Sequence, residues 1–100
     1  MRRGQAIDLL LAREQELRAM SIRELSLFGS TARDEAREGS DLDLAAALDY
    51  DTVCAGGPFA FFGLRDTIAA MIGQRVDLVS EPTRKPALQA EIDRDRVRVY

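Results

Sequence analysis

The chain has 100 residues, of which 46% are hydrophobic and 31% are charged, and its formal net charge is −3 at pH 7. This composition is that of one small globular domain, and its acidic balance argues against a general nucleic-acid-binding protein, because such proteins carry a basic excess. The chain has no histidine and one cysteine, which excludes an intrachain disulfide, a Cys/His zinc site and Ser-His-Asp catalysis. The remaining metal ligands are oxygens, which favour a hard cation such as Mg²⁺.

The first half of the chain predicts a helix, a strand and a turn. Apolar residues at helical spacing predict a helix over 5–20, and the run ELSLF predicts a strand over 24–28. Gly29 permits a sharp turn after this strand. Residues 30–36 are then expected to form a short helix with Ser30 as its cap.

The segment DLDLAAAL, residues 41–48, has two interpretations. Its alternation favours a strand, whereas three consecutive alanines favour a helix. On a strand, Asp41 and Asp43 lie on the same face, roughly 7 Å apart, but on a helix they diverge by about 200°. We take the strand as the prediction, because only this form lets the two carboxylates share a ligand.

The second half predicts a helix over 58–72 that ends at Gly73, a strand over 75–79, a helix over 86–94 and a strand in the final RVRVY. The alternation predicts one α/β domain over 1–100, with a mixed sheet of about four strands and helices packed on it. No apolar stretch is long enough to span a bilayer and none resembles a signal peptide, so we expect a cytoplasmic protein without membrane contact.

Three aspartates stand in strand-like runs between apolar residues. Asp41 and Asp43 share one face, and Asp77, in VDL, would project from a neighbouring strand. Such carboxylates repel one another unless cations lie between them. Two divalent cations about 3.5–4 Å apart can be bridged by a cluster of this kind and can hold a nucleoside triphosphate. The pattern therefore predicts a catalytic metal site.

The glycine-serine turn supplies candidate phosphate contacts. Gly29 allows close approach to the backbone, and Ser30 offers a hydroxyl at the start of a helix. Arg33 and Ser40 are further candidates to bind phosphate oxygens. The structural alternatives are that Ser30 only caps the helix and that Arg33 belongs to a solvated face with local ion pairs.

The sequence LFGSTAR and the downstream DLDL, with ten residues between Ser30 and Asp41, resemble the nucleotidyltransferase superfamily that includes DNA polymerase beta. The family pattern is an apolar residue, Gly, Gly or Ser, a gap of about ten residues, and then Asp-apolar-Asp-apolar. GQRVDLV resembles the segment with the third acid, and ALQAEIDRDRVRVY resembles the closing helix and strand of minimal nucleotidyltransferases. The resemblance thus extends from Leu25 to Tyr100. Asp34 stands where the family usually has glycine, which adds negative charge beside the phosphate site.

The resemblance implies a magnesium-dependent enzyme with ATP as substrate and two Mg²⁺ ions held by Asp41, Asp43 and Asp77, with Asp77 as proton acceptor. Members of this length resemble antitoxins encoded beside a HEPN ribonuclease toxin. This implies transfer of AMP from ATP to a tyrosine of the toxin. The alternatives are a non-catalytic binding module with a vestigial site and a small-molecule nucleotidyltransferase acting with a second subunit. The sequence leaves the oligomeric state open.

Overall fold

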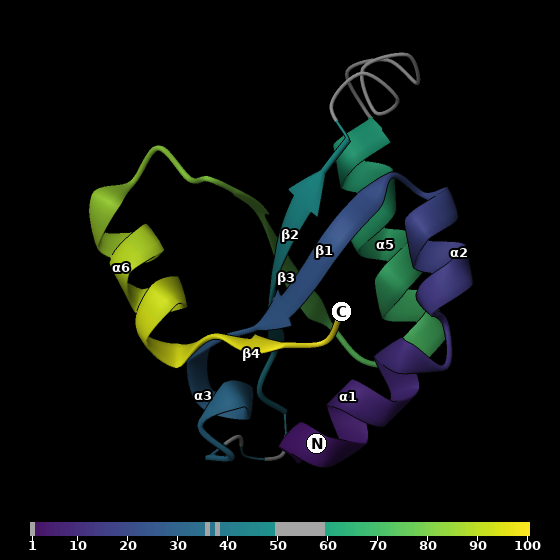
Figure 1. The fold of residues 1–100 in the computed structure, drawn as a ribbon. Helices are drawn as coiled ribbons and strands as arrows, with labels where there is room; N and C mark the ends of the chain where they lie inside the picture. The colour runs from purple at the N-terminus through teal and green to yellow at the C-terminus, as the bar shows by residue number, and fades with distance from the viewer. Residues whose placement is uncertain (1, 36, 38, 50–59) are drawn as a thin grey trace.

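The computed structural model describes residues 2–35, 37, 39–49 and 60–100, and the statements below concern these residues. They form a four-stranded sheet in the order β3-β2-β1-β4, in which β1 is antiparallel to β2 and β4, and β2 is parallel to β3. The predicted α/β class and mixed sheet are confirmed. The elements, in chain order, are α1 (Arg3–Leu11), α2 (Glu14–Ala19), β1 (Ile22–Leu27), α3 (Gly29–Ala32), β2 (Leu42–Leu48), α5 (Ala60–Ile72), β3 (Val76–Glu81), α6 (Pro86–Asp95) and β4 (Val97–Arg98) (Figure 1).

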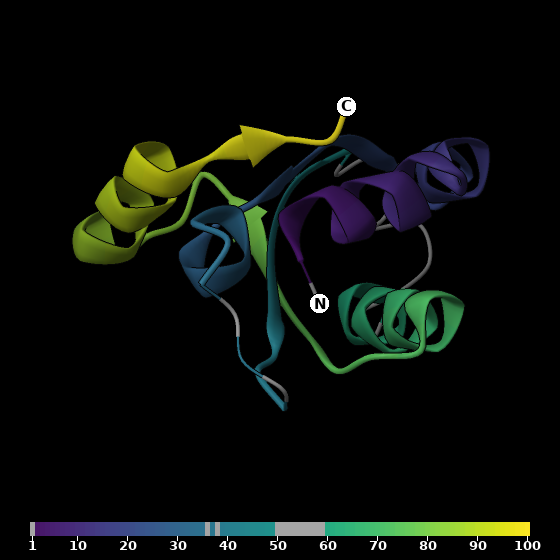
Figure 2. The ribbon, with the colours of Figure 1, turned by 90° about the horizontal axis from the view of Figure 1, so that it is seen from below.

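The two faces of the sheet differ in chemistry. Figure 2 shows α1, α2 and α5 on one side of the sheet and α3 and α6 on the other. The first side holds a large core of buried leucines and other apolar residues, among them Leu27 and Leu44. The second side has a much smaller apolar cluster of Phe28, Ala45 and Ile92. Polar side chains can therefore occupy the α6 face without disturbing the main core.

The ambiguous segment over 41–48 forms strand β2 from Leu42 to Leu48, as predicted. Both edges of β2 are paired, with β1 on one side and β3 on the other. Within the alanine run, Ala45 packs in the cluster under α6, while Ala46 packs in the leucine core. Tertiary pairing on both edges thus outweighs the helix propensity of the alanines.

Two local predictions are wrong. The helix expected over 5–20 is broken after Leu11, and α2 begins at Glu14, because a turn at residues 12–13 redirects the chain along β1. Leu10 of α1 and Leu17 of α2 are both buried. The predicted cap at Ser30 is also absent. Helix α3 begins one residue earlier, at Gly29, and no side chain caps it.

The ends of the second-half helices follow the sequence signals. Helix α5 ends at Ile72, and Gly73 follows with a φ of 68°, in the left-handed region that favours glycine. Positions 58 and 59 of the predicted helix lie outside the described residues. Helix α6 begins at Pro86, as expected for proline at a first helical position.

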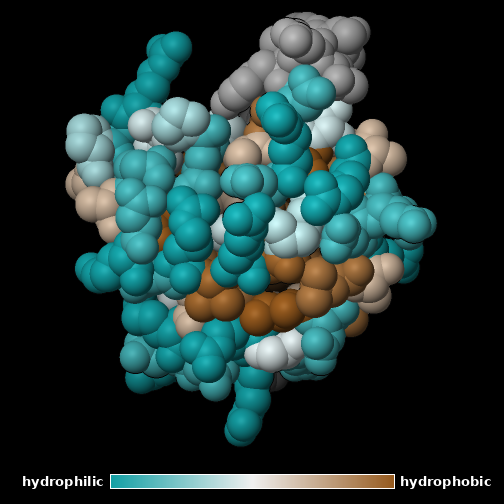
Figure 3. Space-filling view, viewed as in Figure 1, coloured by the Kyte–Doolittle hydropathy of each residue, from teal (hydrophilic) through white to brown (hydrophobic). Residues whose placement is uncertain are grey.

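The C-terminal residues close the sheet beside β1. Val99 is buried and Val97 is half-buried, so the predicted inward alternation holds. The Tyr100 hydroxyl donates to the Ile22 carbonyl at 3.0 Å, and the Arg18 guanidinium lies 4.5 Å from the centre of the tyrosine ring. Figure 3 shows a mainly hydrophilic face with one apolar band at the height of β4 in Figure 1. None of the described helices combines the length and hydrophobicity needed to cross a membrane.

Thr31 is a buried residue whose hydroxyl has no partner among the described residues. Its side chain is only 1% exposed. We expect Thr31→Val to raise the free energy of unfolding by about 1 kcal/mol, because the substitution removes an unpaired buried polar group at similar volume. Urea denaturation measures this change. The matched control is Thr67→Val, where the exposed hydroxyl donates to the Gly63 carbonyl at 2.7 Å and no gain is expected. A loss of stability in Thr31→Val would show that the hydroxyl is bonded in solution.

Candidate active site

Two of the predicted aspartates face each other across neighbouring strands. In the parallel pairing of β2 with β3, Asp43 stands opposite Asp77. Adjacent strands lie about 4.8 Å apart, so the two side chains emerge side by side on one face. This is the α6 face, because Ala45 and Val79, the next alternate residues of each strand, pack in the cluster beneath α6. The fold therefore brings two carboxylates together from segments 34 residues apart, at 43 and 77.

Gly29 is packed against the Asp43 carboxylate. A Cβ atom at position 29 would lie 2.3 Å from the Asp43 Oδ2 atom, which is far inside van der Waals contact. The Gly29 φ is 69°, and the Phe28 N–H donates to the Asp43 carbonyl at 3.2 Å. The turn after β1 is thus tied to β2, and only glycine lets its backbone approach the carboxylate so closely.

The electrostatics around Asp43 favour a bound cation. Desolvation raises the pKa of the Asp43 carboxyl to about 6, and repulsion from Asp77, Glu91 and Asp41 adds to this effect, while Arg33 opposes it. A carboxylate cluster of this kind is unfavourable when ionised and bare, and a divalent cation reverses the repulsion. The donors are carboxylate oxygens, which fit Mg²⁺.

Asp41 lies at the outer end of this cluster. It comes just before β2, its side chain is about half exposed, and its Oδ1 atom is 3.2 Å from Arg75 Nε. Within the described ranges, no group of three or more Cys, Asp or Glu side chains is arranged to enclose a metal ion. A cation at Asp43 and Asp77 would therefore complete its shell with water and phosphate oxygens, which is the usual manner of Mg²⁺ binding.

Arg33 is held by two carboxylates. Its Nη1 atom is 2.6 Å from Asp95 Oδ2, and its Nε atom is 3.2 Å from Glu35 Oε2. The Asp95 side chain is only 5% exposed, so it fixes Arg33 between α3 and α6. The structure thus gives Arg33 defined ion pairs in addition to its influence on Asp43.

The two predicted serines have different environments. Ser30 is half-buried in the first turn of α3, where the leading N–H groups lack helical acceptors. Ser40 shapes the loop before β2. Its hydroxyl accepts from the Arg37 N–H at 3.2 Å, and its carbonyl accepts from Gln74 Nε2 at 3.0 Å.

Asp34, the departure from the family glycine, has a structural explanation. Its φ is 60°, so the position requires the left-handed backbone that glycine adopts freely and aspartate tolerates. Its carboxylate accepts a hydrogen bond from the Arg3 N–H at 3.0 Å. The added negative charge is therefore bound at the start of α1.

Sequence reasoning did not identify two acidic residues of α6 that act on the site. Glu91 raises the pKa of Asp43, and Asp95 holds Arg33. The two are four residues apart and so lie one helical turn from each other. This spacing is visible in the sequence, but it does not reveal which strand the helix covers.

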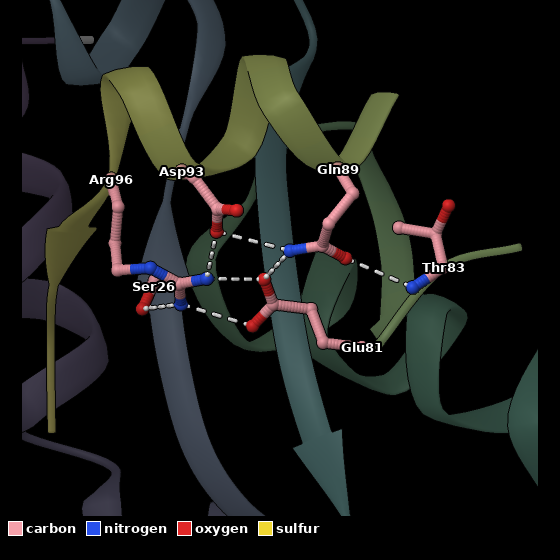
Figure 4. A network of polar contacts seen from close by, with 6 residues as sticks. All are labelled: Ser26, Glu81, Thr83, Gln89, Asp93 and Arg96. Atoms are coloured by element: carbon pink, nitrogen blue, oxygen red, sulfur yellow. Dashed lines mark hydrogen bonds and ion pairs between the residues drawn. The ribbon is translucent and has the colours of Figure 1, made fainter. Parts of the chain in front are cut away.

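A polar network fixes the other flank of α6. Arg96 pairs with Glu81 and Asp93, and it also donates to the Ser26 hydroxyl at 3.2 Å (Figure 4). Gln89 donates to Glu81 at 3.2 Å. The helix is therefore anchored to β1 and β3 on this flank, while its opposite flank faces Arg33 and Asp43.

The sequence matches the family described as "Polymerase beta, Nucleotidyltransferase" over residues 7–100. It is 34% identical over 93 residues to the protein adenylyltransferase MntA of Thermococcus cleftensis, a match that covers 92% of this chain and 90% of that protein. A solved structure provisionally assigned as a minimal nucleotidyltransferase has a TM-score of 0.77 at 29% identity and covers 97% of this chain and 95% of its own. A toxin-antitoxin structure with AMP-PNP has a TM-score of 0.71 at 22% identity, covers 100% of this chain and 73% of its own, and is similar in fold.

Proposed function

Since the chain belongs to the polymerase beta nucleotidyltransferase family, we propose that residues 1–100 act as one domain that transfers AMP from ATP to a hydroxyl group of a protein acceptor. The observation that carries this proposal is the pair of opposed carboxylates, Asp43 and Asp77, packed against the backbone of Gly29. The 34% identity to a protein adenylyltransferase supports ATP as donor and a protein as acceptor.

In the proposed reaction the acceptor oxygen attacks the α-phosphorus of ATP. The bond from this phosphorus to the bridging oxygen breaks, and pyrophosphate leaves. Asp77 takes the proton of the attacking hydroxyl, and Asp43 and Asp41 orient the triphosphate from the other strand. Mg²⁺ bound by these carboxylates would polarise the phosphorus and neutralise charge on the leaving pyrophosphate.

The turn at the start of α3 is the proposed phosphate cradle. The backbone N–H groups of Gly29 and Ser30 lack helical acceptors and are suited to phosphate oxygens. Arg33 and Ser40 stand at the edges of this cradle. Arg33 would exchange its contact with the exposed Glu35 for a phosphate oxygen when the nucleotide binds, while the nearly buried Asp95 continues to hold it.

We further propose an antitoxin that silences a partner toxin of the HEPN ribonuclease type by adding AMP to one of its tyrosines. The likeness to a toxin-antitoxin fold supports a toxin as partner. Among the described residues β3 is an edge strand beside the proposed site, and an exposed edge suits a macromolecular acceptor better than a small molecule.

The test uses the full chain, ATP, MgCl₂ and the protein encoded beside it, followed by intact-mass spectrometry of that protein. We expect a mass gain of one AMP unit or several, abolished by EDTA and by Asp77→Asn. The matched control is Asp66→Asn, which removes an exposed carboxylate of α5 and leaves transfer unchanged. Tight binding without a mass gain would contradict the proposal and favour a binding module.

A further inference from the structure

Strand β3 is an open edge of the sheet beside the site. It pairs with β2 alone among the described residues. The Leu42 N–H donates to the Arg75 carbonyl at 3.0 Å, so the backbone groups of residue 75 point toward β2. Since successive residues of a strand direct their backbone groups to opposite sides, those of Asp77 and Val79 also point to β2, and those of Leu78 and Ser80 point outward. The outer edge therefore presents free donors and acceptors one residue from Asp77.

A hollow follows this edge. It has a volume of about 540 Å³ and is lined by Leu78, Val79 and Ser80 of β3, by residues of the loop after β3, and by Leu88 of α6. Val79 and Leu88 give it an apolar floor, since both pack against the small cluster beneath α6. An edge with an apolar floor and free backbone groups is suited to an added strand.

Two cations stand at the rim of the hollow. Arg84 and Lys85 are exposed neighbours in the loop between β3 and α6. Among the described residues, no carboxylate lies within ion-pairing distance of either side chain. Two adjacent unpaired cations are notable in a chain with a net charge of −3.

The loop that carries these cations is fixed in position. The Thr83 N–H donates to Gln89 Oε1 at 2.9 Å, as Figure 4 shows. The Lys85 N–H donates to the Thr83 hydroxyl at 2.8 Å. Gln89 in turn belongs to the network around Glu81 that anchors α6. The two cations are therefore presented by an ordered backbone, which lowers the entropy lost when a ligand binds them.

We propose that the edge of β3 docks an extended, acidic segment of the acceptor protein as an added strand. Backbone groups of Leu78 and Ser80 pair with the segment, and Arg84 and Lys85 contact its carboxylates. An added strand lies about 4.8 Å from β3, so a residue opposite Asp77 is delivered beside the opposed carboxylates. This inference rests on the proposed function, and it assigns the acceptor a chemical class: a hydroxyl residue preceded or followed by Asp or Glu in an extended segment.

The test compares three nine-residue peptides with a central tyrosine: one with glutamate flanks, one with lysine flanks, and one with glutamate flanks and alternate N-methylated amides. Binding is measured without ATP by fluorescence anisotropy, and AMP transfer by mass spectrometry. We expect the glutamate peptide to bind about tenfold more tightly and to be modified about tenfold faster than the lysine peptide. N-methylation removes the binding, and hydrogen exchange at the Leu78 and Ser80 amides slows only with the unmethylated glutamate peptide.

The variant for this test is Arg84→Glu/Lys85→Glu, and its matched control is Arg23→Glu/Arg65→Glu, which reverses two exposed cations elsewhere. We expect the first variant to lose the preference for the glutamate peptide and the control to retain it. Equal transfer to the glutamate and lysine peptides overturns the docking proposal alone. A raised KM for ATP with unchanged peptide preference assigns the two cations to the nucleotide and also overturns it. A third outcome is selective binding of the glutamate peptide with slowed hydrogen exchange at the Leu78 and Ser80 amides, but no AMP transfer to any peptide or to the partner protein. This outcome supports the docking proposal and contradicts the proposed function.

Discussion

Replacing Asp43 with asparagine is expected to reduce AMP transfer by a factor of at least about 10²–10³ and to stabilise the fold. The loss of transfer follows from removing the more buried of the two opposed carboxylates. The gain in stability follows because the pKa of Asp43 is raised to about 6 by desolvation and by neighbouring acids, so its charge is unfavourable in the folded state. At pH 7 we expect a gain of about 1–2 kcal/mol, less than the full pKa shift would give, because the partly exposed side chain is screened by solvent.

The same group predicts a pH dependence of stability. Between pH 4 and 6 the folded state binds more protons at Asp43 than the unfolded state does, so the free energy of unfolding falls as the pH rises. Above that range the contribution is constant. Urea denaturation at pH 4, 5, 6 and 7 without magnesium should show this fall in the wild type and a smaller one in Asp43→Asn.

Asp66→Asn is the control for the Asp43 substitution, because Asp66 is a highly exposed carboxylate on α5. We expect its stability and transfer to match the wild type. Addition of MgCl₂ should stabilise the wild type and Asp66→Asn, but not Asp43→Asn. If Asp43→Asn were less stable than the wild type at pH 7, the desolvated, repulsive environment described for this carboxylate would be incorrect.

Replacing Gly29 with alanine is expected to damage both stability and transfer. The new Cβ atom would meet Asp43 Oδ2 at 2.3 Å, and the backbone φ of 69° is unfavourable for alanine. The left-handed backbone alone costs about 1–2 kcal/mol, and relief of the collision requires the carboxylate to move. Because a displacement of about 1 Å in a reacting group can cost 10²-fold in rate, we expect a comparable loss of transfer.

Gly73→Ala separates the two effects. Gly73 has a φ of 68°, nearly that of Gly29, but no atom lies within 4 Å of an added Cβ. We expect Gly73→Ala to lower the free energy of unfolding, measured by urea denaturation, by the cost of placing alanine in the left-handed backbone. We expect its AMP transfer to be unchanged. In an Asp43→Ala background, the stability loss caused by adding Gly29→Ala should fall to that of Gly73→Ala, because the collision with the carboxylate is absent. Equal transfer by Gly29→Ala and the wild type would show that close packing of the turn on Asp43 is dispensable.

The parts of the site that could be predicted are those that depend on residues close together in the sequence. The alternation in DLDL places Asp43 on the face of β2 opposite to its leucines, and glycine after a strand predicts the turn that brings Gly29 against the Asp43 carboxylate. The opposition of Asp43 and Asp77 required one further step, the expectation that their strands are neighbours. That expectation is met because β2 and β3 are joined through α5, in the usual crossover between parallel strands.

The parts that could not be predicted depend on how distant elements pack. Helix α2 packs against β1 after the break at residues 12–13, whereas the apolar spacing alone suits one continuous helix. The pairing of Arg33 with Asp95 joins residues 62 positions apart. The influence of Glu91 on Asp43 likewise depends on which flank of α6 faces the strands. No local pattern contains this information.

The unequal faces of the sheet have a consequence for how this protein can change. The leucine layer supports the fold from the side of α1, α2 and α5, whereas the chemistry lies on the side of α6, above little more than Phe28, Ala45 and Ile92. Substitutions that retune substrate choice therefore fall where few buried contacts are at stake. Evolution or engineering can diversify acceptors on such a scaffold with small losses of folding free energy, because recognition and structural integrity reside in separate layers.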